Sequence, residues 1–182
     1  AQNVGIGTSS PSVKLHVSSG TSGDAVVLIE ADTDNNNEDD TPILRLSQDG
    51  GATISDIGIE GTAGTLFTNS LANSTYITTT GNTPLQFATN DSARMTIMNS
   101  TGNVGIGTSS PTTLLELKST TASAGLCITA DNASQSDINL GDEDDVNIQR
   151  IRSDHTDNSL QFQTNNAERM RIDSSGRLFI GK

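Results

Sequence analysis

Large aromatic side chains are nearly absent from this sequence. It contains no Trp, one Tyr and four Phe, and hydrophobic residues make up 32% of its 182 residues. Aromatic side chains usually supply much of a domain's buried area, and an average domain is close to half apolar when glycine is counted. These shortages argue against a compact core built by one copy of the chain. They favour thin apolar stripes that are buried against other copies.

Basic residues and long apolar runs are also scarce. Ten Lys and Arg against 22 Asp and Glu give a net charge of −12, and such a surface repels nucleic acid and anionic lipid. The sequence has no apolar run of about 18 residues, the length that a membrane-spanning helix requires. We therefore expect no nucleic-acid partner and no membrane insertion.

One cysteine and two histidines limit the available chemistry. Cys127 cannot form a disulfide within the chain, and we interpret it as a small apolar residue of the predicted strand GLCITA. His16 lies in the predicted strand VKLHV. His155 has Ser153 and Asp154 beside it, but neighbours along a strand point apart and do not converge as a catalytic triad. We predict no catalytic residue and no cofactor.

Two stretches of the chain are rich in acidic residues. They are EADTDNNNEDD (30–40) and GDEDD (141–145). In the first, Asp32, Asp34 and Asn36 have the alternating spacing of the first three ligands of a calcium loop. However, Asn37 stands where that loop has Gly, and Ile43 stands where it has a bidentate Glu. We interpret both stretches as solvated loops and predict no metal site. If calcium were bound, Asp32, Asp34 and Asn36 would be the candidate ligands.

A ten-residue phrase occurs twice in the chain. QNVGIGTSSP spans residues 2–11, and GNVGIGTSSP spans residues 102–111. The phrase contains no His, Cys, Asp, Glu, Lys or Arg, and its Pro would end a strand because Pro cannot donate a ladder hydrogen bond. Its recurrence predicts two β-repeat modules, residues 1–102, with a variable insert at 18–82, and residues 103–182.

A longer match joins two stretches of the chain. TPLQFATNDSARMTIMNSTGNVGIG (83–107) matches NSLQFQTNNAERMRIDSSGRLFIG (158–181). Phe87 and Met95 of the first stretch correspond to Phe162 and Met170 of the second. The offset changes by one residue inside a turn while both flanks stay matched, which a loop tolerates and a strand does not. We interpret each stretch as three short strands joined by turns.

Alternating apolar and polar residues predict further strands. No segment keeps an apolar stripe at helical spacing over about ten residues, so almost no helix is expected. The further predicted strands are VKLHV (13–17), DAVVLIEA (24–31), PILRLS (42–47), ISDIGIEG (54–61), STYITTT (74–80), LLELK (114–118), GLCITA (125–130), SDINLGD (136–142) and VNIQRIRSD (146–154).

Glycine alternates with apolar residues inside the repeated phrase. Glycine within a strand indicates close approach of another backbone, or a sharp bend. We predict that the apolar pairs face a core and that the glycines mark places where chains cross or a sheet turns a corner. The residues are Val4, Gly5, Ile6 and Gly7 in one copy, and Val104, Gly105, Ile106 and Gly107 in the other.

NVGIGTSSPSVKLHV and AERMRIDSSGRLFIG resemble repeats in the tail fibres and tail spikes of bacteriophages, especially marine phages. Residues 3–17, 85–117 and 160–181 carry the resemblance. It implies a homotrimer in which strands of three chains enclose a narrow apolar core. Similar phrases occur in secreted surface proteins of bacteria, so a bacterial origin stays open. In tail fibres such repeats often precede a chaperone domain, which is absent from this sequence.

We therefore expect an all-β, elongated, fibrous repeat of short strands and hairpins, intertwined as a homotrimeric rod. Its expected role is structural, as the shaft or distal part of a phage tail fibre that supports host attachment. It would be extracellular, in the virion tail, with other copies of itself and a host receptor or glycan as partners. The alternative is a secreted bacterial adhesin or surface filament.

A polysaccharide-depolymerising tail spike is the third reading. It is disfavoured because glycan-cleaving sites usually have aromatic sugar platforms, and aromatics make up only 3% of this sequence. The last copy of the phrase, GRLFIGK (176–182), lacks the following TSSP. We expect the natural protein, or a filament partner, to continue there.

Overall fold

The chain folds into short β-strands and a single helical turn. The computed structural model describes residues 2–31, 33, 39–146 and 148–181. Across these residues it contains no α-helix, and its one helical turn is the 3-10 turn η1 (Asp49–Gly51). The prediction of an all-β chain with almost no helix is confirmed. The strands are β1 (Val4–Ile6), β2 (Leu15–Val17), β3 (Ile43–Gln48), β4 (Thr53–Ile59), β5 (Thr75–Thr80), β6 (Leu85–Thr89), β7 (Ser92–Ile97), β8 (Val104–Ile106), β9 (Leu115–Leu117), β10 (Gln135–Leu140), β11 (Gln149–Asp154), β12 (Ser159–Thr164), β13 (Ala167–Ile172) and β14 (Leu178–Ile180).

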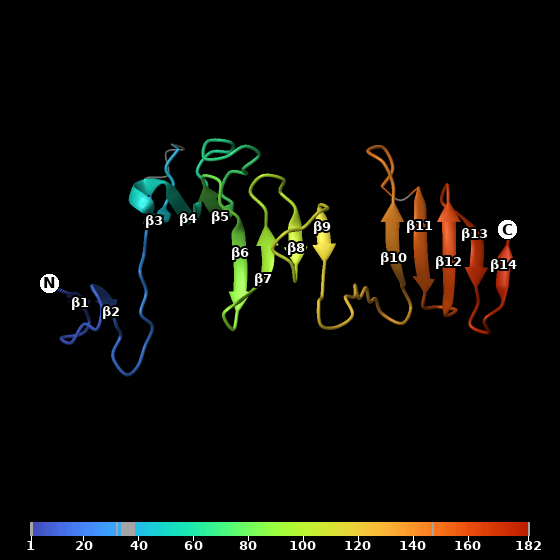
Figure 1. The fold of residues 1–182 in the computed structure, drawn as a ribbon, viewed down its shortest axis with the longest axis horizontal. Helices are drawn as coiled ribbons and strands as arrows, with labels where there is room; N and C mark the ends of the chain where they lie inside the picture. The colour runs from blue at the N-terminus through green and yellow to red at the C-terminus, as the bar shows by residue number, and fades with distance from the viewer. Residues whose placement is uncertain (1, 32, 34–38, 147, 182) are drawn as a thin grey trace. The chain divides into compact units, whose positions relative to one another are not determined.

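These strands form four small sheets in two compact units (Figure 1). Residues 1–118 hold the sheets β1-β2, β3-β4-β5 and β6-β7-β8-β9, and residues 119–182 hold the sheet β10-β11-β12-β13-β14. The predicted module boundary at 102/103 follows the sequence repeat and lies between β7 and β8, which are paired. The division into two repeat modules stays a prediction.

The two matched stretches have the same hairpin turn. Two-residue turns, Asn90-Asp91 and Asn165-Asn166, join β6 to β7 and β12 to β13. All four residues have φ between 50° and 56°. Asn and Asp tolerate this left-handed conformation better than other residues with a side chain, and such turns suit the twist of a hairpin. The local sequence therefore determines where both hairpins reverse.

Each of these hairpins also contains a β-bulge beside its Phe–Met pair. Arg94 is the extra residue in β7, and Arg169 is the extra residue in β13. The Nε of Arg94 donates to Thr89 Oγ1 at 3.0 Å, and the Nε of Arg169 donates to Thr164 Oγ1 at 3.1 Å. The bulge changes the register by one residue, so Phe and Met stay on the apolar side of the hairpin.

The repeated phrase forms a strand, a loop and a second, parallel strand. An eight-residue loop joins β1 to β2, and an equally long loop joins β8 to β9. Parallel neighbours usually need a longer crossover. Here a side-chain hydrogen bond closes each loop: Asn3 Nδ2 donates to the Pro11 carbonyl at 3.1 Å, and Asn103 Nδ2 donates to the Pro111 carbonyl at 3.2 Å.

The glycine inside each of these strands is required by the loop that follows it. A Cβ on Gly5 would lie 2.3 Å from the carbonyl oxygen of Thr8, and a Cβ on Gly105 would lie 2.4 Å from that of Thr108. Real Cβ atoms do not approach so closely, so only glycine fits. The close approach predicted at these glycines is therefore made by backbone of the same chain.

Seven of the nine further predicted strands are present, with ends that shift by up to three residues. The other two predictions, at residues 24–31 and 125–130, are wrong for the single chain. Within the described part of the chain, neither stretch forms backbone hydrogen bonds with a neighbouring strand. An apolar pattern alone does not make a strand, because a strand also needs a hydrogen-bonded partner.

Candidate interaction surface

The single chain leaves most of its apolar side chains in solvent. Among the described residues, Tyr76 is the one buried hydrophobic side chain, at 6% exposure, whereas thirty large hydrophobic side chains are exposed. The accessible surface is 13266 Å², although a compact 19.0 kDa chain would expose about 8,400 Å². Two separate globular units with the lengths of residues 1–118 and 119–182 would together expose about 10,000 Å². The single chain therefore exposes roughly 3,000–5,000 Å² more surface than globular units of this mass would.

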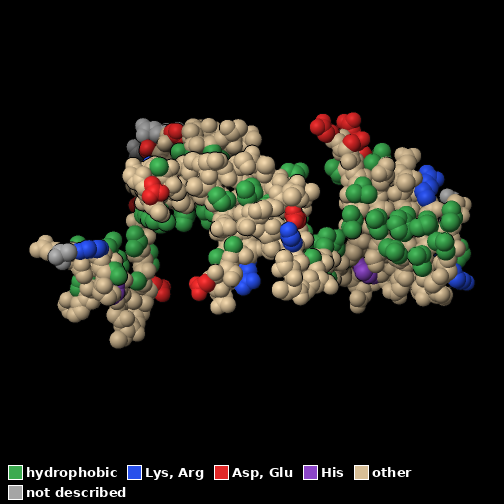
Figure 2. All heavy atoms as spheres, in the orientation of Figure 1, with side chains coloured by type: hydrophobic (Ala, Val, Ile, Leu, Met, Phe, Trp, Pro, Cys, Tyr) green, Lys and Arg blue, Asp and Glu red, His purple; other side chains and the backbone are tan. Residues whose placement is uncertain are grey.

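The five-stranded sheet carries most of its apolar residues on one face, here called the apolar face, whereas Phe179 lies on the other face beside Arg171. Cross-strand partners place five of them in one row: Ile138, Ile151, Phe162, Met170 and Ile180. A second row two residues along holds Leu160, Ile172 and Leu178. Alternate residues of a strand point to the same side, so the two rows are continuous. Figure 2 shows the resulting band of hydrophobic atoms across β10–β14.

Ion pairs occupy the opposite face of the same sheet. Arg152 forms a bidentate pair with Asp137, with Nε–Oδ1 at 2.9 Å and Nη2–Oδ2 at 2.8 Å. The hydrogen bond from Arg152 holds the pKa of Asp137 below its ordinary value. Arg171 contacts Glu168 at 3.1 Å and Asp157 at 3.3 Å. These charges form ion pairs within the chain. The apolar face is therefore the side of the sheet whose side chains are left to pack against another molecule.

The three-stranded sheet β3-β4-β5 repeats this division. Leu44, Ile57 and Ile77 are cross-strand neighbours on one face, and all three are exposed. On the other face Arg45 forms a bidentate pair with Asp56 at 2.8 and 2.9 Å. Hydrogen bonding to Arg45 lowers the pKa of Asp56. Two separate sheets of the chain thus combine one exposed apolar face with one ion-paired face.

A buried carboxylate fixes the loop that follows β4. Glu60 has no exposed surface, and its Oε1 accepts hydrogen bonds from Thr65 N at 3.2 Å, Thr65 Oγ1 at 2.9 Å and Leu66 N at 3.2 Å. Burial raises the pKa of Glu60, but the hydrogen bonds from Thr65, Leu66 and Ser70 outweigh that effect and leave the pKa lowered. A substrate cannot reach this group, so its role is structural.

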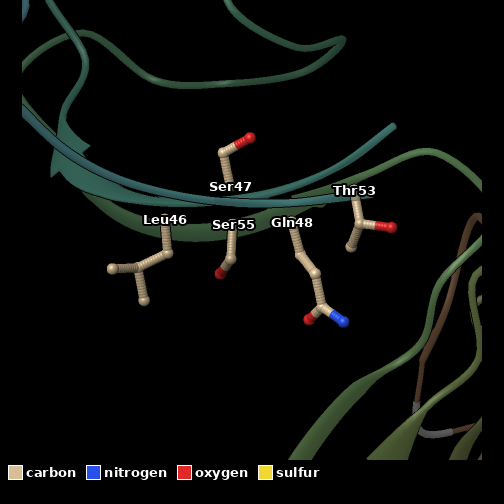
Figure 3. Close-up of a pocket in the computed structure, with 5 residues that line it drawn as sticks. All are labelled: Leu46, Ser47, Gln48, Thr53 and Ser55. Carbon is tan, nitrogen blue, oxygen red and sulfur yellow. The ribbon is translucent and has the colours of Figure 1, made fainter. Parts of the chain in front are cut away.

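A small pocket of about 180 Å³ lies at the end of the β3–β4 hairpin. Figure 3 shows that Ser47 points to one side of the hairpin, whereas four other lining residues point to the opposite side. These four are Leu46, Gln48, Thr53 and Ser55. None of the five has a carboxylate, imidazole or amine that could act as a general base for a hydroxyl. The pocket supports no catalytic assignment.

The structure brings together one Ser–His pair that the sequence analysis missed. Ser136 Oγ and His155 Nε2 lie 2.9 Å apart, although 19 residues separate them in the chain. The nearby carboxylate of Asp131 accepts hydrogen bonds from Ser134 and from Ala133 N. The imidazole of His155 donates no hydrogen bond to Asp131, so the arrangement of a triad is incomplete. Ser153 and Asp154, the neighbours of His155 in sequence, are not the residues that bond it.

The other candidate residues have ordinary surroundings. His16 Nδ1 accepts a hydrogen bond from Ser12 N at 3.4 Å, and Cys127 is an exposed thiol. The calcium candidates Asp32, Asp34 and Asn36 lie outside the described residues. Among the residues that are described, no three His, Cys, Asp or Glu side chains are grouped so as to hold a metal ion. In the same residues, no helix has the length and apolarity needed to cross a membrane.

The predicted repeat residues divide by exposure. Val4, Ile6, Ile106 and Phe87 are exposed in the single chain. Val104, Met95, Met170 and Phe162 are half-buried. No core within one chain covers the apolar pairs of the phrase.

No protein-family model matches the sequence, and no curated protein matches it significantly.

Proposed function

We propose that this chain is a non-enzymatic structural subunit of an extracellular β-fibre, in which three copies bury their apolar sheet faces against one another. The observation that carries the proposal is the two-sided character of the sheets. In the sheets β3-β4-β5 and β10–β14, one face has charges paired within the chain, and the other carries exposed or half-buried rows of apolar side chains. Exposed apolar patches of this extent are unusual on a monomer and mark interaction sites.

The uncovered surface has the size that a permanent assembly requires. In a trimer each chain contributes half of each of two interfaces, so the area it buries equals about one whole interface. Permanent complexes bury on the order of 2,000–5,000 Å² per interface. The excess of roughly 3,000–5,000 Å² left by the single chain falls within this range. Closing the sheets around an axis would also remove exposed strand edges.

The shaft or distal part of a phage tail fibre is the role that the resemblance favours. In that role the variable loops between the repeats contact a host receptor or glycan, and the repeated phrases keep the rod uniform. Three copies, each with a net charge of −12, carry −36, which limits association between neighbouring rods. A secreted bacterial adhesin or surface filament would use the same surfaces. Neighbouring baseplate genes would favour the phage fibre, and an encoded signal peptide would favour the adhesin.

Negative-stain electron microscopy of the purified chain tests the fibre proposal. Thin rods of uniform width are expected. Separate particles of single-chain size would overturn the proposal. Incubation with host polysaccharide tests the third reading, since a tail-spike enzyme would shorten the polymer and a structural fibre would leave its length unchanged.

A further inference from the structure

We propose that residues 24–30 and 124–130, here called the unpaired segments, are interchain β-strands that hydrogen-bond to sheet edges of another copy of the chain. This rests on the assembly of copies proposed above and names the segments through which the copies join. The segments read DAVVLIE and AGLCITA.

The backbones of the unpaired segments have no hydrogen-bond partner among the described residues. Within the described part of the chain, no backbone N–H or C=O of either segment forms a hydrogen bond. Other strands of the chain, such as β4 and β11, are paired on both sides. Backbone N–H and C=O groups in a folded protein almost all form hydrogen bonds. Once an apolar segment is buried, water cannot reach its backbone groups, so these groups must bond to other protein groups.

The side chains of the unpaired segments are as exposed as their backbones. Val26 and Leu28 are 75% and 76% exposed, and Leu126 is 68% exposed. Both segments are rich in aliphatic residues that suit strands and contain no Pro. An exposed, unpaired stretch of this kind is a ready template for pairing with another chain.

The two unpaired segments occupy equivalent places in the chain. Each follows a parallel pair, β1–β2 or β8–β9, and each precedes the first strand of an antiparallel sheet, β3 or β10. Counted from the Asn of the repeated phrase, they lie at the same distance, 100 residues apart. The same unpartnered arrangement therefore occurs twice in one chain, which indicates a shared role for the two segments.

An apolar groove separates each unpaired segment from the nearby sheet. A groove of about 370 Å³ lies between Val27–Ile29 and a face that includes Leu44, Ile57 and Ile59. A second groove of about 270 Å³ lies between the pair Leu126 and Ile128 and a face that includes Ile138 and Ile151. Each groove is open and lined mainly by aliphatic side chains, so it can accept the apolar side chains of a further strand.

A second copy of the chain fits this role better than a foreign peptide. Each copy brings both a strand to donate and free edges to receive one, at β3 and β5 in one unit and at β10 and β14 in the other. Donation around a closed ring of identical chains gives every donated strand an edge to pair with. The excess surface of roughly 3,000–5,000 Å² also matches a permanent assembly of copies.

Hydrogen–deuterium exchange on the purified chain, with its mass measured in the same buffer, tests the inference. If the copies assemble, the amides of the unpaired segments should exchange on the order of 100-fold more slowly than in an unstructured peptide. Residues 119–123, in the adjoining loop, should exchange rapidly and serve as the internal reference. An assembled protein whose unpaired segments exchange as fast as that loop overturns the inference and leaves the proposed function standing.

A monomeric mass has a different consequence, because it overturns the proposed function itself. If the chain is monomeric and the segments gain protection only when host-cell extract is added, a second copy is excluded as the occupant.

Proline substitutions separate hydrogen bonding from simple apolar packing. Val27→Pro and Cys127→Pro each remove one N–H from the middle of a segment that makes no hydrogen bond in the single chain, so the sheets themselves should fold normally. We expect each substitution to lower the assembly constant by about tenfold or more per donated strand. The controls Val27→Ala and Cys127→Ala keep the N–H and should retain protection of the segments. Proline variants that assemble as tightly as their alanine controls would overturn interchain pairing.

Discussion

Truncation of Ile138 to Ala should weaken assembly far more than truncation of its neighbour Asn139. Ile138 begins the apolar row of the five-stranded sheet, and 45% of its surface is exposed in the single chain. Asn139 follows it on β10, points to the opposite face and is exposed. The two substitutions therefore alter opposite faces of the same strand.

The magnitude follows from the exposed fraction of Ile138. Ile→Ala removes three carbon groups, which are together worth about 2.4 kcal/mol when fully buried. Since 45% of the residue remains to be covered, the loss on assembly is about 1.1 kcal/mol per chain. Three copies lose about 3.2 kcal/mol, which corresponds to an association constant about 200-fold lower. An exposed residue such as Asn139 should contribute within about 0.5 kcal/mol per chain.

Sedimentation equilibrium over a guanidinium series measures both association constants. Circular dichroism on the same samples shows whether each variant keeps its strands. Equal association constants for Ile138→Ala and Asn139→Ala, with both variants folded, would refute burial of the apolar face between copies.

Three further predictions follow from single sites. Gly105→Ala should lower the stability of the β6–β9 sheet by about 1–3 kcal/mol, seen as a lower Tm, because its Cβ would collide with the Thr108 carbonyl. An unchanged Tm would show that the loop can move. Pairing with Arg152 lowers the folded-state pKa of Asp137 below 3.8, so this pair should stabilise the fold above that pH and lose its effect as pH falls through the lowered value. Asp137→Asn should therefore lower the Tm at pH 7 and flatten its decline in acid, and an unaltered acid decline would contradict this. Cys127, exposed in the single chain, should react slowly with a thiol reagent in the assembly and rapidly after denaturation, and equal rates would contradict its burial.

The strands and turns were predictable because their signals are local. Alternation in LQFAT and LQFQT, the Asn-rich two-residue turns and the apolar row through Phe162 and Met170 depend on residues close in sequence. The register slip at Arg94 and Arg169 left only a faint signal, since a bulge adds one residue without changing the composition of the strand. The parallel pairing of β1 with β2 was also hidden, because an eight-residue loop is short for a parallel connection.

The sequence indicated that apolar side chains would lack a core within one chain, but it did not indicate which segments pair with one another. The shortage of aromatics indicated that one chain could not build a core, and the exposed apolar face agrees with that reasoning. The sequence around Val27 and Cys127 predicts strands, yet their pairing depends on neighbours that no sequence pattern identifies. The Ser136–His155 contact was missed because register, rather than sequence distance, brings the two residues together.

The mass of the chain in dilute, non-denaturing solution tests the central claim most directly. Burial of the apolar faces among three copies predicts 57.0 kDa, three times the 19.0 kDa of one chain. A folded species of 19.0 kDa that persists at high protein concentration would contradict it.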